Sequence, residues 1–130
     1  MPAPGSDSYS AEAKVAAGEA LKALIDTGSA GRIEILNEAD TVLATFTLTD
    51  PCGSVNGTTG VLTLGYAAST VNASASGTAS WGRVCESDGT VHWSAPAQAG
   101  STAVEGKVVI NTLTLVSGSP VTIISTTLNG

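Results

Sequence analysis

The stretch from Ala73 to Asp88, ASASGTASWGRVCESD, places the strongest constraint on what this chain can fold into. Up to Trp81, Ala and Gly residues share one parity with the tryptophan, and Ser or Thr occupies the other. Alternation with a period of two predicts a β-strand with one buried and one solvated face. We expect this long strand to contain a bulge near Gly82, because an isolated glycine inside a strand often marks one.

A hairpin is predicted directly after this stretch. Asp88-Gly89 separates it from Thr90-Val91-His92-Trp93, where a strand pattern resumes. An Asp-Gly pair between two alternating runs is a strong signal for a tight hairpin turn.

One segment, residues 11–27, has the periodicity of an α-helix. Ser10 is a suitable N-cap and Gly28 is a suitable residue to end the helix. Six apolar residues recur at helical spacing and are expected to face the core, with docking on a partner as the alternative. They are Ala13, Ala17, Ala20, Leu21, Leu24 and Ile25.

Further alternating segments predict a β-rich domain. A hairpin is expected over residues 31–49, a short strand over 61–64, and strands over 107–116 and 121–128. Residues 94–106, rich in Ala, Gly and Ser, are expected to form a loop. One helix and about seven strands predict a mainly β fold: an antiparallel β-sandwich or jelly-roll-like domain with one N-terminal α-helix.

The length of 130 residues predicts a single domain. We expect this domain to span residues 11–130 and to follow a flexible arm, rich in Pro, Gly and Ser, over residues 1–10.

The charge of the chain argues against two classes of partner. Eleven acidic and five basic residues give a net charge of −6. No Lys/Arg cluster is present to neutralise phosphates, so neither a nucleic acid nor an anionic membrane surface is expected as a partner. No apolar run approaches the ~20 residues that span a bilayer. The first ten residues lack the regions of a secretory signal, so we expect synthesis in the cytoplasm and use there or as part of a particle.

The chain offers little support for an enzyme. A catalytic triad needs a nucleophile, a base and an orienting acid. The single histidine, His92, lies in a Ser/Thr-rich strand pattern, and no nucleophile-elbow motif is present. The acidic residues cluster at turns, where they usually stabilise the turn. No catalytic residue is therefore predicted.

Cofactor and metal sites are not expected either. Neither a calcium-binding loop nor a phosphate-binding glycine motif occurs. Cys52, Cys85 and His92 lack the spacing of a zinc site. In the absence of a secretory signal we expect Cys52 and Cys85 to be reduced thiols, with a disulfide as the alternative.

Arg83 is the most informative charged residue. It lies on the same strand as Trp81 and at the same parity. One interpretation is a solvated arginine, or one paired with a nearby acid such as Glu86. The other is an anchor in a protein interface, where Trp and Arg are enriched.

A series of short blocks resembles one group of known proteins. In order they read ALIDTGSAG, GRIEILN, LATFTLTDP, GVLTLG, SGTASWGRV, SDGTV and SGSPVTI, and they cover roughly residues 20–124. This ordered set resembles small structural proteins of tailed bacteriophages and prophages. The chain departs from the group at Gly82, where a larger residue is usual, and in its two cysteines.

The resemblance implies a non-enzymatic virion component, a head decoration (cement) protein bound to the outer capsid surface after synthesis in the host cytoplasm. Its partners would be the major capsid protein and further copies of itself in a dimer or trimer. The residues expected at interfaces are Trp81, Arg83, Trp93 and, in the arm, Pro4 and Tyr9. The loop at 94–106 is expected to contribute as well.

Two alternative functions remain open at this level. One is a tail or head–tail structural protein. The other is a glycan- or receptor-binding β-sandwich with Trp81, Trp93 and Tyr66 as an aromatic platform. An exposed Trp93 beside acids in a groove would favour sugar binding, whereas exposed Ala, Thr and Val patches would favour assembly.

Overall fold

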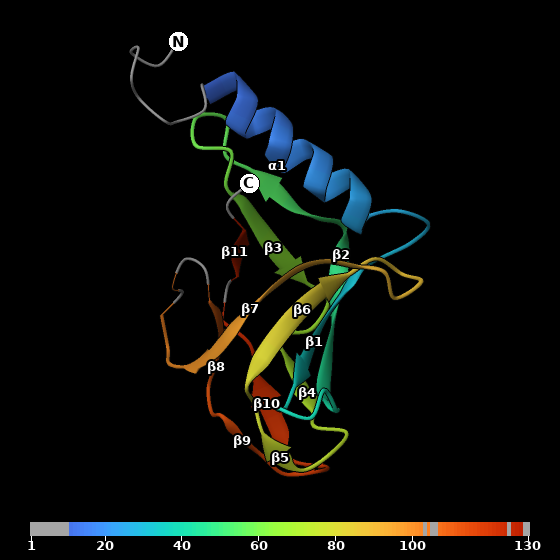
Figure 1. Ribbon diagram of the computed structural model, residues 1–130, viewed down its shortest axis with the longest axis vertical. Helices are drawn as coiled ribbons and strands as arrows, with labels where there is room; N and C mark the ends of the chain where they lie inside the picture. The colour runs from blue at the N-terminus through green and yellow to red at the C-terminus, as the bar shows by residue number, and fades with distance from the viewer. Residues whose placement is uncertain (1–10, 103, 105–106, 125, 129–130) are drawn as a thin grey trace.

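The computed structural model describes residues 11–102, 104, 107–124 and 126–128 (Figure 1). The arm expected at residues 1–10, with Pro4 and Tyr9, lies outside the described residues. The described part contains one helix, α1 (Ala11–Ile25), and eleven strands. The strands are β1 (Arg32–Leu36), β2 (Val42–Val55), β3 (Leu62–Tyr66), β4 (Thr70–Asn72), β5 (Gly77–Thr78), β6 (Trp81–Cys85), β7 (Val91–Ala99), β8 (Val108–Ile110), β9 (Thr114–Leu115), β10 (Pro120–Thr122) and β11 (Thr127–Leu128).

Seven strands form one curled sheet in the order β11-β3-β2-β1-β6-β7-β8. The pairs within it are antiparallel except β7–β8, which is parallel, so the sheet is mixed. The remaining four strands form two short pairs, β10–β4 and β5–β9. The prediction of a mainly β domain with one N-terminal helix is confirmed.

The last described segment of the chain connects the two ends of the curled sheet. Ile123, directly after β10, bridges Ile110 of β8 at one end of the strand order. Four residues later β11 pairs with β3 at the other end. The segments 120–124 and 126–128 therefore contact opposite ends of the sheet, which lets the sheet curl around a common interior (Figure 1).

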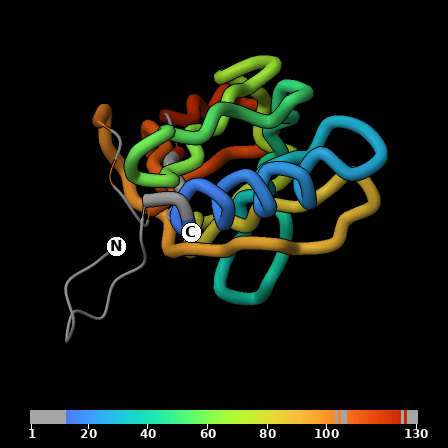
Figure 2. The backbone as a smooth tube through the Cα atoms, turned by 90° about the horizontal axis from the view of Figure 1, so that it is seen from above, coloured from blue at the N-terminus to red at the C-terminus, as the bar shows by residue number. Residues whose placement is uncertain are grey.

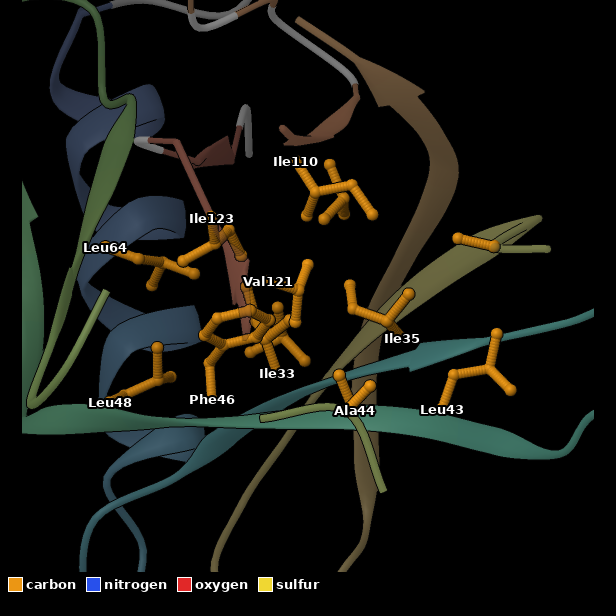
Figure 3. Packing of buried hydrophobic residues seen from close by; sticks show 14 of the residues in the cluster. Ile33, Ile35, Leu43, Ala44, Phe46, Leu48, Leu64, Ile110, Val121 and Ile123 are labelled. Carbon is orange, nitrogen blue, oxygen red and sulfur yellow. The ribbon is translucent and has the colours of Figure 1, made fainter. Parts of the chain in front are cut away.

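The interior is filled by apolar side chains from strands far apart in the sequence. In Figure 3, Phe46 and Ile33 point toward Val121 and Ile123, and Ile110 lies beyond them. All five side chains are almost fully buried. Non-directional packing of this kind is what closes the curled sheet around one core.

Helix α1 lies across one end of the curled sheet (Figure 2) and contacts β2, β3 and β7. Gly18 is buried in this contact, and a Cβ there would clash with the carbonyl oxygen of Gly60 and lie 2.9 Å from Val55 Cγ1. The absence of a side chain thus lets the helix backbone approach the 56–60 turn closely.

This close approach makes the predicted core stripe of the helix largely wrong. Ala13, Ala17, Ala20 and Leu24 are exposed, while Leu21 is half-buried and Ile25 is fully buried. Glycine has no apolar side chain, so the spacing of apolar residues gave no sign that Gly18 is buried. The buried side of the helix was therefore predicted incorrectly. The helix ends at Ile25, two residues before the predicted end, and Gly28 has the positive φ of 82° expected of a residue that follows a helix.

The segment that was predicted as one long strand is two. β5 and β6 belong to different sheets, although burial alternates from Ala73 to Ala79 as expected. The predicted bulge at Gly82 is wrong, because the β1–β6 register runs without interruption from Cys85 to Trp81. Gly82 instead accommodates a neighbour, since a Cβ there would lie 2.9 Å from Val108 Cγ2. The irregularity lies between Val84 and Cys85, on the β7 side.

The other strand predictions are partly confirmed. β1–β2 and β6–β7 form the two expected hairpins, and Gly89 has the expected positive φ of 95°. The loop predicted at 94–106 is wrong in its first half, where β7 continues to Ala99. Ala95 and Ala97 pack against the core, and the weak β-propensity of alanine hid this alternation. The strands predicted at 107–116 and 121–128 are each broken into two short ones.

We predict that Gly18→Ala destabilises the protein even though alanine is the better helix former. The added methyl group cannot fit against Gly60, so the free energy of unfolding should fall by about 1–3 kcal/mol in urea denaturation. At an exposed helix position the same exchange would raise it by about 1 kcal/mol. Ala16→Gly, on the exposed side, is the control and should lower the value by about that propensity difference. An increase in stability for Gly18→Ala would contradict the close packing.

Candidate functional site

The outside of the curled sheet brings the sequence-predicted residues Trp81 and Arg83 together. We call this surface the outer face. It comprises solvent-facing positions of four adjacent strands, in cross-strand register. These are Thr45 and Thr47 of β2, Arg32 and Glu34 of β1, Trp81 and Arg83 of β6, and Ser94 and Pro96 of β7.

Glu34 is the centre of the outer face. It lies on β1 between two core isoleucines and opposite Arg83 of β6. Its carboxylate accepts a hydrogen bond from Arg83 Nε at 2.7 Å and another from Arg32 Nε at 3.1 Å. The Glu34 side chain is only 11% exposed, whereas the two arginines are about one third exposed. One nearly buried acid therefore orients both guanidinium groups.

The pKa of Glu34 results from two opposing effects. Burial penalises the charged carboxylate and favours protonation. The hydrogen bonds and charges of Arg83 and Arg32 outweigh this penalty and lower the pKa below its ordinary value of 4.5. The cluster is consequently ionised at neutral pH.

Arg83 is held from a second side by Trp81, whose ring centre lies 5.8 Å from the guanidinium carbon. This distance fits a cation–π contact. The guanidinium carries five N–H donors, and Glu34 receives the one on Nε. No hydrogen bond from its Nη atoms to a described residue is found. Arg83 is thus an oriented cation with donors left for an external group.

The prediction that Trp81 and Arg83 share a face is confirmed, but the acid beside Arg83 is not Glu86. Glu86 pairs with His92, with 2.9 Å between Oε1 and Nε2. Glu34 is 49 residues away from Arg83 in the chain, and only the β1–β6 pairing brings the two together. The one sequence signal for Glu34 is the spacing of two residues from Arg32, which puts both side chains on one face of a strand.

The aromatic platform considered for glycan binding is not assembled. Trp93 and Tyr66 both pack against the hydrophobic core, whereas Trp81 lies on the outer face. Tyr66 makes an edge-to-face contact with Phe46 and donates a hydrogen bond to Thr126 Oγ1 at 2.6 Å. Burial raises the pKa of Tyr66 to about 12.

Cys52 and Cys85 are both fully buried and free, as expected for reduced thiols. Burial and the charge of Asp26 raise the pKa of the Cys52 thiol to about 12. Burial and the charge of Glu34 also raise the pKa of Cys85. Both environments disfavour the reactive thiolate.

The described residues contain no group of three or more His, Cys, Asp or Glu side chains placed to hold a metal ion. Nor does the described part include a helix long and apolar enough to cross a membrane.

Comparison of the chain with protein families, with curated proteins and with solved structures finds no significant match. In the absence of a match, the geometry of the outer face indicates what this surface can bind. An oriented arginine on an aromatic ring, at a surface of Thr, Ser and Pro side chains, is suited to protein recognition.

We predict that Glu34→Gln lowers stability at neutral pH and that the loss fades in acid. The folded-state pKa of Glu34 lies below 4.5, so its stabilisation is complete above the unfolded-state pKa and disappears as the pH falls through the folded-state pKa. At pH 7 we expect a loss of about 1–3 kcal/mol in the free energy of unfolding.

Urea denaturation of both proteins from pH 7 to pH 3 measures this difference. Glu38→Gln, in the exposed turn before β2, is the control and should change stability by less than about 0.5 kcal/mol throughout. A difference for Glu34→Gln that is independent of pH would contradict the ion-pair assignment.

A second prediction concerns the two thiols. In the native protein at pH 8, Cys52 and Cys85 should react with Ellman's reagent at least about a hundredfold more slowly than in urea, because reaction requires exposure by unfolding. Cys52→Ala and Cys85→Ala variants assign each signal. Rapid labelling of the native chain would refute the burial. Absence of labelling in urea without a reductant would instead indicate a disulfide.

Proposed function

We propose that this chain is a non-enzymatic structural protein of a tailed-phage virion, a head decoration protein that binds and stabilises the capsid lattice from outside. The protein would be made in the host cytoplasm and would act as a dimer or trimer together with the major capsid protein. The ordered resemblance of blocks over residues 20–124 supports the class. The outer face supports the mode of action.

The observation that carries the proposal is the Trp81–Arg83 pair on an open sheet surface, oriented by the nearly buried Glu34. A preorganised arginine loses less conformational entropy on binding, which favours contacts with another protein. Several contacts of modest strength would add through multivalency on a repeating lattice.

We also propose that the fold is of the antiparallel sandwich or jelly-roll class. The curled sheet with its linked ends is compatible with that class in most of its pairings. The parallel pair β7–β8 is the part that departs from it.

The proposal is tested by sedimentation with purified capsids that lack this protein. We expect saturable co-sedimentation at a copy number related to the lattice symmetry, and greater resistance of the loaded capsids to heat. Trp81→Ala should raise the concentration for half-saturation by at least about tenfold, the usual effect of truncating an interface anchor. Thr63→Ala, at an exposed position of β3, is the matched control and should leave binding unchanged.

Retention of the protein in the supernatant at all concentrations would overturn decoration. Binding to isolated tails instead of heads would favour the tail or head–tail alternative. Binding to a glycan array that is lost in Trp81→Ala would favour the receptor-binding alternative.

A further inference from the structure

The side of α1 that faces away from the sheet is apolar. Five residues on this side are exposed, and Leu24 is 49% exposed. Glu19 is the one charged residue among the exposed, described positions of the helix. We call this surface the alanine side. It comprises Ala16, Ala17, Ala20, Ala23 and Leu24, with Glu19 at its margin.

A helix that is apolar on both sides is usually covered on both. Here α1 packs on its own sheet through Gly18, Leu21 and Ile25. The alanine side is exposed, whereas Gly18 and Ile25 on the opposite side of the helix are buried. Short side chains also allow a neighbouring surface to come close to the helix backbone.

The outer face has the complementary chemistry. Trp81 and Pro96 supply apolar surface, and Arg83 supplies an oriented cation whose Nη donors have no described partner. The whole chain carries an excess of acid, with a net charge of −6. The carboxylate of Glu19, an exposed acid beside the alanine side, therefore has the charge that complements Arg83.

We infer that the outer face is a self-association surface that receives the alanine side of α1 from a second copy of this chain. Glu19 of one copy would pair with Arg83 of the next, while the alanine side would pack on Trp81 and Pro96. A helix laid on a sheet is the ordinary way in which these two elements share an apolar interface. The inference rests on the proposed function and assigns the outer face to the contact between copies, so Trp81→Ala would weaken capsid binding by removing the multivalency of the associated copies.

The contact is heterologous, because the two surfaces are different parts of the molecule. After a first contact, one copy retains a free outer face and the other retains a free alanine side, so association continues to a closed ring or an open chain. A helix of 15 residues is only about 22 Å long. The interface is thus smaller than the roughly 800 Å² per partner of stable complexes, and association is expected at micromolar concentrations or above.

Two variants that each block one surface test this. Ala20→Arg places a long cation at the centre of the alanine side and keeps a good helix former there. Ser94→Glu adds a carboxylate opposite Arg83 in the cross-strand register, which occupies its free donors and repels Glu19. Both original side chains are exposed, so the fold should be retained, as circular dichroism and urea denaturation will verify.

Sedimentation velocity and equilibrium, from micromolar to several hundred micromolar protein, are the measurements. The wild type should associate with concentration, and each variant alone should associate at least about tenfold more weakly. An equimolar mixture of the two variants should form a heterodimer and nothing larger, because one supplies an intact alanine side and the other an intact outer face. Thr63→Arg, which adds the same bulk on β3, is the control and should associate as the wild type does.

Three results would overturn the inference: a wild type that stays monomeric over the whole range, association that survives either substitution, or a mixture that remains monomeric. The assay contains no capsid. A chain that binds capsids but never self-associates contradicts this inference alone, and a chain that self-associates as expected but ignores capsids contradicts the proposed function alone.

Discussion

The fold depends on the way the last strand segment links the two ends of a curled sheet. Ile123 meets Ile110 on one side, and β11 pairs with β3 on the other. Without these contacts, the interior faces of β1 and β2, which carry Ile33 and Phe46, would have no opposite wall. The hydrophobic effect is proportional to the apolar area removed from water, so closing the sheet is what makes burial of these side chains complete.

Helix α1 covers one end of the sheet, and it can do so because Gly18 has no side chain. Gly18 brings the backbone of α1 onto the 56–60 turn, where even a methyl group would clash. Ile25 is then fully buried, and the rest of the helix turns its alanines outward. A single close approach therefore fixes both how one end of the sheet is covered and which apolar surface remains outside. The proposed self-association follows from that second consequence.

The outer face brings several of the few charged residues of this chain into contact with one another. Two of the five basic residues, Arg32 and Arg83, share one nearly buried carboxylate. Isolated surface ion pairs contribute little to stability, but a buried acid that loses its partners is costly. Glu34 thus has a structural role and a recognition role at once, because the hydrogen bond that satisfies it also orients Arg83 beside Trp81. The single histidine has a simpler place, paired with Glu86.

Local features of the molecule could be predicted from the sequence, because they depend on neighbouring residues. The period-two patterns, the Asp88-Gly89 turn and the end of α1 before Gly28 all rest on backbone preferences within a few positions. The shared face of Trp81 and Arg83 follows from the same alternation. The tertiary structure alone decided that Glu34 pairs with Arg83 across 49 residues, that Gly18 and not the alanine stripe faces the sheet, and that β8 joins β7 in parallel. These outcomes depend on which distant surfaces fit together in space, and sequence periodicity contains no information on that fit.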